Sequence, residues 1–397
     1  MMGLKKFIIK CNMISLVSDT INREDINALI EWLSQEPMPR LTKGPLTSEL
    51  EAKWAKKIGT KYSVFVNSGS SAILLMLAAL NEGEYLKNKK IVAPALSWVT
   101  DVSSPMLLGL ETILCDCNLE DLSCDLNQLK QIFEDHRPSV FISVAPLGFV
   151  PKMKELMDLC EEYGVILLED ICESMGSKYR DNYLGSFGFA SVFSMYYGHH
   201  LSTIEGGFIN TNDEEFYHLL LMMRSHGWDR DLPEWKQKEL REKYNSKSIF
   251  NMSYDFYLPG MNLRSTDLQA FIGIRAIDRL DDYSVKRNQN LNSYLKNIKS
   301  NLLKLRVDQE DFISNFAFPI LHPKRDEIVK ELQQNKIEVR PLIAGNMGNK
   351  PFWYEKYGKS NFLGNCDLID KIGFYLPNHQ NLSIDDILKI SSIINNY

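Results

Sequence analysis

The chain of 397 residues is predicted to be an α/β protein with a mostly parallel sheet, helices on the faces of that sheet, and a smaller α+β domain at its C-terminal end. Two observations predict this fold. Between residues 62 and 194, short apolar runs alternate with segments of helical periodicity, which is typical of parallel strands joined by helices. After residue 264 the alternation gives way to one long helical pattern and then to short mixed elements. We therefore expect two domains, residues 1–264 and 265–397.

The elements follow in a regular order along the chain. Ile26, Leu29, Ile30 and Leu33 recur at helical spacing, which predicts an amphipathic helix over residues 21–34. Strands are then expected at residues 62–66, 90–94, 112–115, 139–144, 165–168 and 190–194. Helices are expected between them at residues 71–80, 125–133 and 152–163. Apolar residues at helical spacing from 268 to 280 open the second domain.

Charge and composition exclude several classes of protein. A net charge of −6 lacks the excess of positive charge that nucleic-acid binding requires. No apolar run reaches the roughly 18 residues of a membrane span, and none forms a signal-peptide core, so we expect a cytoplasmic protein. The seven cysteines include no CxxC pair. Cys115, Cys117 and Cys124 raise the idea of a metal cluster, but the neighbouring sequence offers no fourth ligand, and the alternative is free thiols around a strand end.

Three segments carry residues suited to chemistry. Residues 67–71 (NSGSS) form a turn between a strand and an apolar helix, where free backbone N–H groups and the helix dipole can hold a phosphate. The alternative is an ordinary capped helix start. Glu169, Asp170 and Glu173 follow a buried strand, at the edge of the sheet where ligands bind in α/β proteins. One carboxylate there could pair with a protonated ring nitrogen, and the alternative is an acidic helix N-cap.

The third segment contains two adjacent histidines, His199 and His200, between a strand and a glycine-rich turn. Taken alone, such residues are more often part of a loop than of a catalytic site. Their meaning therefore depends on the rest of the chain.

Several motifs in order give the chain a family resemblance. They are residues 41–45 (LTKGP), 67–72 (NSGSSA), 169–170 (ED), 185–188 (GSFG), 205–207 (EGG), 262–264 (NLR) and 376–377 (LP). In this set the chain resembles the DegT/DnrJ/EryC1/StrS sugar aminotransferases, a branch of the fold-type-I enzymes that use pyridoxal phosphate (PLP). The resemblance implies a seven-stranded sheet in the large domain.

The resemblance also implies roles for particular residues. Ser70, Ser71 and Ser194 would hold the cofactor phosphate, and Asp170 would pair with the pyridine nitrogen. Trp98 would stack on the cofactor ring, although without the resemblance it would be taken as a core tryptophan. Asn262 would reach the phosphate of a neighbouring subunit, which implies a homodimer.

His199 departs from the family, whose aminotransferases have at this position the lysine that binds PLP. No lysine occurs between Lys178 and Lys236. The chain is therefore most similar to the subset of 3-dehydratases of 3,6-dideoxysugar biosynthesis, which have histidine here and a Glu placed like Glu173. The resemblance implies removal of the C3 hydroxyl of a nucleotide-linked 4-keto-6-deoxysugar by pyridoxamine phosphate (PMP), with His199 as a base titrating near neutrality.

Partners and alternatives complete these expectations. L-Glutamate would regenerate PMP, and GDP is the expected nucleotide. No iron–sulfur cluster is expected, because residues 228–254 contain no cysteine. Residues 145–148 (APLG) and 344–346 (AGN) differ from many relatives and leave the nucleotide and the sugar open. A nucleotide-sugar aminotransferase, another PMP-dependent sugar enzyme and a catalytically silent family member remain as alternatives.

Overall fold

A computed structural model describes residues 13–245, 249–252, 254–359 and 363–397. Its centre is a seven-stranded sheet with the strand order β1-β9-β8-β5-β4-β2-β3. The strands are β1 (Tyr62–Val66), β2 (Lys90–Pro94), β3 (Glu111–Cys115), β4 (Val140–Val144), β5 (Ile166–Asp170), β8 (Ala190–Ser194) and β9 (Gly207–Thr211). Only β9 runs against its neighbours in this sheet. The prediction of a mostly parallel sheet is confirmed.

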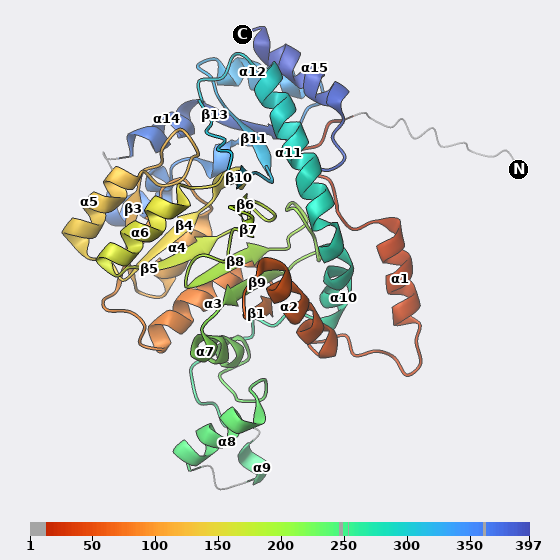
Figure 1. Ribbon diagram of the computed structural model, residues 1–397, viewed down its shortest axis with the longest axis vertical. Coiled ribbons are helices and arrows are strands. Elements are labelled where there is room, and N and C mark those ends of the chain that lie inside the picture. Colours follow the sequence, from red (N-terminus) through yellow and green to blue (C-terminus); the bar gives the residue numbers. More distant parts are fainter. Residues whose placement is uncertain (1–12, 246–248, 253, 360–362) are drawn as a thin grey trace, which may run out of the picture.

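Helices cover both faces of this sheet (Figure 1). They are α2 (Pro45–Ile58), α3 (Gly69–Glu82), α4 (Val99–Leu107), α5 (Leu126–His136), α6 (Met153–Tyr163) and α7 (Glu214–Arg224), whereas α1 (Arg23–Leu33) lies farther out and packs against α10 (Asp267–Ala276). Side chains alternate along each strand, so Phe141 packs in one buried cluster while Ile142 packs in the other. Because both faces are buried, the strands read as nearly continuous apolar runs in the sequence.

The C-terminal part is an α+β unit, as predicted. It contains α10 (Asp267–Ala276), η2 (Ile277–Arg279), α11 (Leu280–Asn297), α12 (Arg325–Gln334), α13 (Pro351–Tyr357), α14 (Gly364–Ile372) and α15 (Ile384–Asn395). A sheet with the order β11-β13-β12 consists of β11 (Ala317–Leu321), β13 (Gly373–Pro377) and β12 (Arg340–Pro341). Its short 3-10 turns include η3 (Leu342–Ala344) and η4 (Met347–Asn349), and a further one, η1 (Pro146–Gly148), follows β4 in the large part.

The two parts are joined by several contacts. A small three-stranded sheet pairs β10 (Asp311–Phe312) with β6 (Lys178–Tyr179), which also pairs with β7 (Asn182–Tyr183). Near the start of the described chain, Ile14 forms a parallel bridge with Ile337. Helix α10 packs against α2, so the element that opens the second predicted domain contacts the first. The boundary at residues 264 and 265 stays a prediction.

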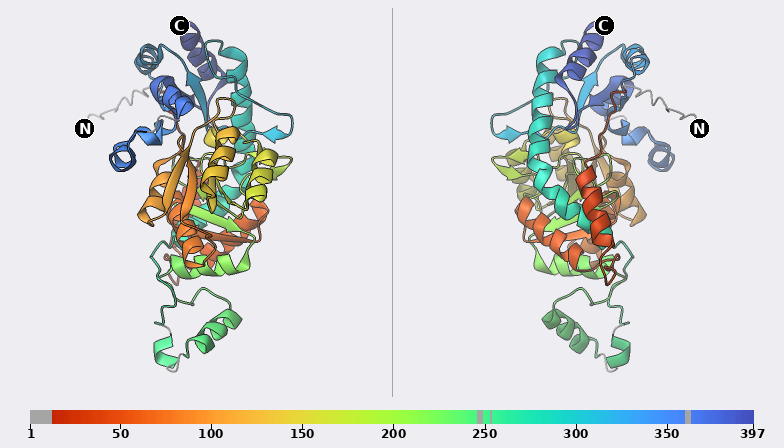
Figure 2. Two further views of the ribbon diagram at one scale, coloured as in Figure 1. Left: turned by 90° about the vertical axis from the view of Figure 1, so that its left-hand side faces the viewer. Right: turned by 90° about the vertical axis from the view of Figure 1, so that its right-hand side faces the viewer.

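One segment, which contains two short helices, projects from the body of the molecule. Helices α8 (Glu234–Lys243) and α9 (Ile249–Met252) project beyond α7 in both views (Figure 1, Figure 2). No residue of α8 is buried. Among all the described helices, none combines the length and the apolar character that crossing a membrane requires.

Candidate active site

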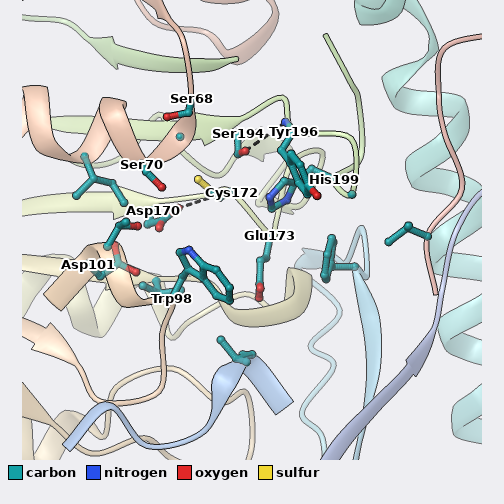
Figure 3. Close-up of a pocket in the computed structure, with 18 of the residues that line it drawn as sticks. Ser68, Ser70, Trp98, Asp101, Asp170, Cys172, Glu173, Ser194, Tyr196 and His199 are labelled. Atoms are coloured by element: carbon teal, nitrogen blue, oxygen red, sulfur yellow. Dashed lines mark hydrogen bonds between the residues drawn. The ribbon is translucent and has the colours of Figure 1, made fainter. Parts of the chain in front are cut away.

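A cavity of ≈ 320 Å³ lies at the carboxyl ends of the parallel strands, where α/β proteins bind ligands (Figure 3). Val144, Asp170 and Ser194, the last residues of β4, β5 and β8, line it. Arg340 and Tyr375 line its other side and come from the small C-terminal sheet. The cavity therefore lies between the central sheet and the C-terminal part.

The N-terminus of α3 forms one wall of the cavity. Ser68 caps this helix, because its Oγ accepts the N–H of Ser71 at 3.0 Å. The N–H groups of Gly69 and Ser70 lie in the first turn, where they have no intrahelical acceptor. A Cβ at Gly69 would lie 2.9 Å from the Cβ of Ser194 and 3.1 Å from the Sγ of Cys172, so only glycine allows this close approach. The alternative of an ordinary capped helix start therefore holds for the geometry of this turn. The positive end of the helix dipole also points into the cavity.

The three serines predicted to hold a phosphate are placed differently. Ser70 and Ser194 line the cavity, and the Oγ of Ser194 accepts the N–H of Tyr196 at 3.3 Å. Ser71 is not among the lining residues, and its Oγ lies 2.9 Å from the Oγ of Ser68. Ser68 was not predicted, although it occupies the capping position of the same turn. Ser71 therefore supports the geometry of the turn, while Ser68, Ser70 and Ser194 face the cavity.

Two buried aspartates meet in the cavity. Asp170 Oδ1 accepts the N–H of Cys172 at 2.8 Å. Asp101, on α4, is fully buried, and its carboxyl oxygens have no donor among the described residues; they lie within hydrogen-bond reach of the Asp170 carboxyl. Burial raises the pKa of both groups, and the charge of Asp170 raises the pKa of Asp101 further. Asp101 is therefore the protonated member of the pair and donates a hydrogen bond to Asp170.

Asp101 was missed in the sequence. It stands three residues after Trp98, so both residues lie on one side of the first turn of α4. Trp98 itself lines the cavity and is 57% exposed. Its interpretation as a core tryptophan is wrong, and an aromatic ring lies where a planar ligand could stack.

Glu173 is a third buried acid in the cavity. Its Oε2 accepts the N–H of Leu147 at 3.2 Å. Burial, with a smaller contribution from the charge of Asp170, raises the pKa of Glu173 to about 7. The segment after β5 is a turn and not a helix, so the interpretation of Glu169, Asp170 and Glu173 as a helix N-cap is wrong. Glu169 points away from the cavity and accepts the backbone N–H groups of residues 185, 187 and 188.

His199 faces the cavity from the turn after β8. The backbone of Cys172 hydrogen-bonds its imidazole, and Nδ1 has no hydrogen-bond partner among the described residues. The ring lies between those of Phe316 and Tyr196, with centroid distances of 5.5 and 6.1 Å. Burial lowers the pKa of His199 to about 4, so the expectation of titration near neutrality is wrong. The imidazole is neutral at pH 7 and has one free acceptor.

The second histidine has a different role. His200 is buried, and its Nε2 lies 2.9 Å from the carbonyl oxygen of Ser314. It therefore anchors the turn to the C-terminal part and leaves His199 at the cavity. No lysine is found among the described residues that line the cavity.

Asn262 does not line this cavity within the chain. Its side chain is exposed, its Oδ1 accepts from Arg264 Nε at 3.0 Å, and its backbone bridges to Ser225. Its predicted reach into a neighbouring subunit stays a prediction. The C-terminal contributors Arg340, Phe316 and Tyr375 were also missed, because no local pattern marks residues that join a site across such sequence distances.

The fold and this site together define a protein of the aminotransferase fold, whose cavity is lined by the start of a helix, a buried acid pair and an exposed tryptophan. The model of the DegT/DnrJ/EryC1/StrS aminotransferase family matches residues 19–395. The chain belongs to this family.

Comparison with individual proteins gives more specific similarities than the family match. The GDP-4-keto-6-deoxy-D-mannose 3-dehydratase of Escherichia coli O55:H7 is 35% identical over 357 residues, and the match covers 87% of this chain and 91% of the relative. The enzyme of the same name from Yersinia pseudotuberculosis is 32% identical and covers 92% of this chain and 94% of its own length. A crystal structure of GDP-4-keto-6-deoxymannose-3-dehydratase with a trapped PLP-glutamate geminal diamine has a TM-score of 0.87 and 32% identity, covering 96% of this chain and 100% of that one.

Proposed function

We propose that the protein is a PLP/PMP-dependent 3-dehydratase that removes the C3 hydroxyl of a nucleotide-linked 4-keto-6-deoxysugar in 3,6-dideoxysugar biosynthesis. The observation that carries the proposal is His199, a neutral imidazole with a free Nδ1 in a cavity whose described lining contains no lysine. The relatives that support the assignment are 3-dehydratases of a GDP-linked sugar. An aminotransferase would need a lysine in this cavity.

The cavity fits the proposed cofactor. The Asp101–Asp170 pair is buried and has no cationic partner among the described residues, which suits a protonated pyridine nitrogen. The start of α3, with Ser68, Ser70 and Ser194, suits a phosphate group. The exposed ring of Trp98 offers a stacking surface.

The bound cofactor would supply an electron sink for cleavage of the C3–O bond. His199 would accept a proton at Nδ1, because its other nitrogen is held by the Cys172 backbone. A low pKa makes it a weak base, but it also keeps the imidazole free of protons at neutral pH. Glu173, with a pKa of about 7, could supply a proton to the departing hydroxyl. Phe316 and Tyr196 shield the imidazole from water.

Asp101 would act through Asp170. A neutral acid that donates to Asp170 stabilises the Asp170 carboxylate and fixes the direction of its second oxygen. The pair would then present one negative charge to the pyridine nitrogen instead of two, which limits the cost of burying them together. Asp101 is therefore a positioning residue in this proposal.

The substrate and the amino donor follow from the relatives and from the rim of the cavity. We assign a GDP-linked 4-keto-6-deoxysugar as substrate and L-glutamate as the donor that regenerates PMP. Arg340 is the one guanidinium among the described lining residues, and its Nη2 lies 3.2 Å from Glu338 Oε1. The exposed guanidinium could exchange this half-buried partner for the carboxylate of glutamate.

The proposal includes a homodimer in the cytoplasm that uses neither nucleic acid nor a membrane. Asn262 would complete the partner's site. The projecting segment that contains α8 and α9 carries exposed aromatic side chains, Trp235, Tyr244, Tyr254 and Phe256, that a second subunit could cover. Solution scattering checks this point, and a monomer with full turnover would contradict it.

A spectroscopic assay tests the reaction. The PLP form should lose its absorbance on addition of L-glutamate and recover it, with release of ammonia, when a GDP-linked 4-keto-6-deoxysugar is added. Borohydride should not attach the cofactor to the wild-type chain, because no lysine binds it. CDP- and TDP-linked sugars serve as comparison substrates. Formation of a 4-amino sugar without ammonia release would contradict the proposal and favour an aminotransferase.

A further inference from the structure

Four of the six described cysteines gather in one buried cluster at the edge strand β3. Cys115 and Cys117 lie at and just after the end of β3, Cys124 lies on the returning segment, and Cys366 lies in the first turn of α14. The Cys366 thiol lies within hydrogen-bond reach of the Cys117 thiol, although 249 residues separate them in sequence. The fourth cysteine that the local sequence did not offer is therefore supplied by the C-terminal part.

Three ligand atoms in this cluster are close enough for one metal ion. The thiols of Cys117 and Cys366 and a carboxylate oxygen of Asp116 all lie within 4.8 Å of one another, and all three residues are buried. Two thiolates on a tetrahedral zinc ion lie about 3.8 Å apart, since each Zn–S bond is about 2.3 Å long. The spacing fits a mononuclear site.

The carboxylate of Asp116 is already oriented for such a role. Its Oδ1 accepts the N–H groups of Cys117 and Cys366, both at 2.9 Å, and its Oδ2 accepts the N–H of Asn365 at 2.9 Å. A carboxylate has about four acceptor positions, so one remains on Oδ2. Backbone donors of this kind hold metal ligands in place.

Cys124 lies beside this group, with its thiol within hydrogen-bond reach of the Cys115 thiol, and it can become the fourth ligand when its side chain turns towards Cys117. Cys117 and Cys124 are opposite each other in an antiparallel bridge, flanked by the bonds Asn118 N–H to Ser123 O and Asp125 N–H to Asp116 O. This is the non-hydrogen-bonded type of pair, in which the Cα atoms are about 4.5 Å apart and the side chains are close. Cys115 is less suited, because its Sγ already lies 3.5 Å from the carbonyl oxygen of Asp116.

We propose that Cys117, Cys366 and Asp116 bind one zinc ion that ties the end of β3 to the start of α14, with Cys124 as the fourth ligand after rotation of its side chain. Sulfur-rich donor sets select thiophilic metals such as zinc. None of these four residues lines the cofactor cavity. The inference therefore goes beyond the proposed function and does not depend on it.

Metal analysis of the full-length holoprotein tests the site. Protein purified under reducing conditions is incubated with Zn²⁺, freed of excess metal and analysed by mass spectrometry, and a second sample is loaded with Co²⁺ to detect thiolate charge-transfer absorbance. We expect about one zinc per chain, at least tenfold less in Cys366→Ser and Cys117→Ser, and an unchanged content in the control Cys160→Ser. Cys160 is a buried thiol on α6 outside the cluster.

Thermal unfolding gives a second readout on the same proteins. Zinc should raise the melting temperature of the wild type and of Cys160→Ser, and should leave that of Cys366→Ser unchanged. If the serine variants fail to fold, the zinc content of Cys366→Ala is compared with that of the wild type instead. Less than a tenth of an equivalent of zinc in the loaded wild type, iron in its place, or an unchanged content in folded Cys366→Ser would overturn the proposal.

Discussion

Two regions of this molecule hold carboxylates in opposite electrostatic surroundings. In the cofactor cavity, Asp101, Asp170 and Glu173 lie together and their pKa values are raised by burial. Beside α7, the buried Arg224 pairs with Glu51 and Asp231. Burial opposes ionisation of Asp231 as well, but the positive charges of Arg224 and Lys43 lower its pKa.

The difference separates stability from function. The chain supplies its own cations at Arg224, so that region is complete in the folded chain and can stabilise it. In the cavity the acids have no cation of their own among the described residues except Arg340 at the rim, so the cavity suits a positively charged ligand. We therefore expect substitutions in the cavity to change chemistry more than folding, and substitutions at Arg224 to do the reverse.

The largest effect is expected at His199. His199→Asn should still bind PMP but lose dehydration by roughly 10²- to 10⁴-fold, because a positioned general base is removed. His199→Lys should bind PLP covalently and shift towards transamination. Ammonia release and absorbance measure both outcomes. Full activity in His199→Asn, or a borohydride-fixed cofactor in the wild type, would show that the cavity has been misassigned.

Arg224→Met should have the largest effect on stability. Removal of the guanidinium leaves Glu51 and Asp231 without their buried partner, which typically costs about 3–5 kcal/mol of unfolding free energy. Denaturant titration measures the loss, and Lys53→Met, which breaks an exposed pair with Asp278, is the control. A loss as small as that of the control would remove the contrast between the two regions.

Asp170→Asn should weaken both half-reactions, because the amide does not keep the pyridine nitrogen protonated. A hydrogen bond to a charged group contributes about 1.5–3 kcal/mol, so the affinity for PLP should fall roughly 10- to 150-fold. Fluorescence titration of the apoprotein with PLP gives this value. If Asp170→Asn left both the PLP affinity and the turnover unchanged, the pyridine nitrogen would not contact Asp170.

Asp101 offers a matched pair of variants. Asp101→Asn keeps a hydrogen-bond donor towards Asp170 and should bind PLP about as well as the wild type, whereas Asp101→Val should bind roughly tenfold more weakly. The absorbance of bound PLP as a function of pH should shift in the valine variant only. A shift in the asparagine variant of equal size would mean that Asp101 acts as an anion and not as a neutral donor.

A pH dependence of stability is expected from Glu173. Its pKa rises from 4.5 to about 7 on folding, so the folded state holds this proton more tightly than the unfolded state. The apoprotein should therefore lose stability as the pH rises from about 5 to 7, and the loss should level off above 7. In Glu173→Gln this part of the slope should be absent. Denaturant titrations at several pH values check the sign, and an identical slope in both proteins would contradict the raised pKa.

The sequence by itself determined the architecture and the outline of the site. Apolar runs placed six of the seven strands of the central sheet within one or two residues, because burial is a local property of each strand, but they did not place β9. The turn before α3, Asp170 at the end of β5 and His199 in the place of a lysine could be recognised from motifs alone. These residues lie at the carboxyl ends of neighbouring strands, where the fold brings them together.

Only the tertiary structure decided what surrounds those residues. The low pKa of His199 comes from desolvation by groups that include Phe316, more than a hundred residues away. Asp101 meets Asp170, and Cys366 meets Cys117, through packing between elements that share no sequence pattern. Desolvation and contact depend on which distant side chains fill the same space, so they are fixed only when the whole chain has folded.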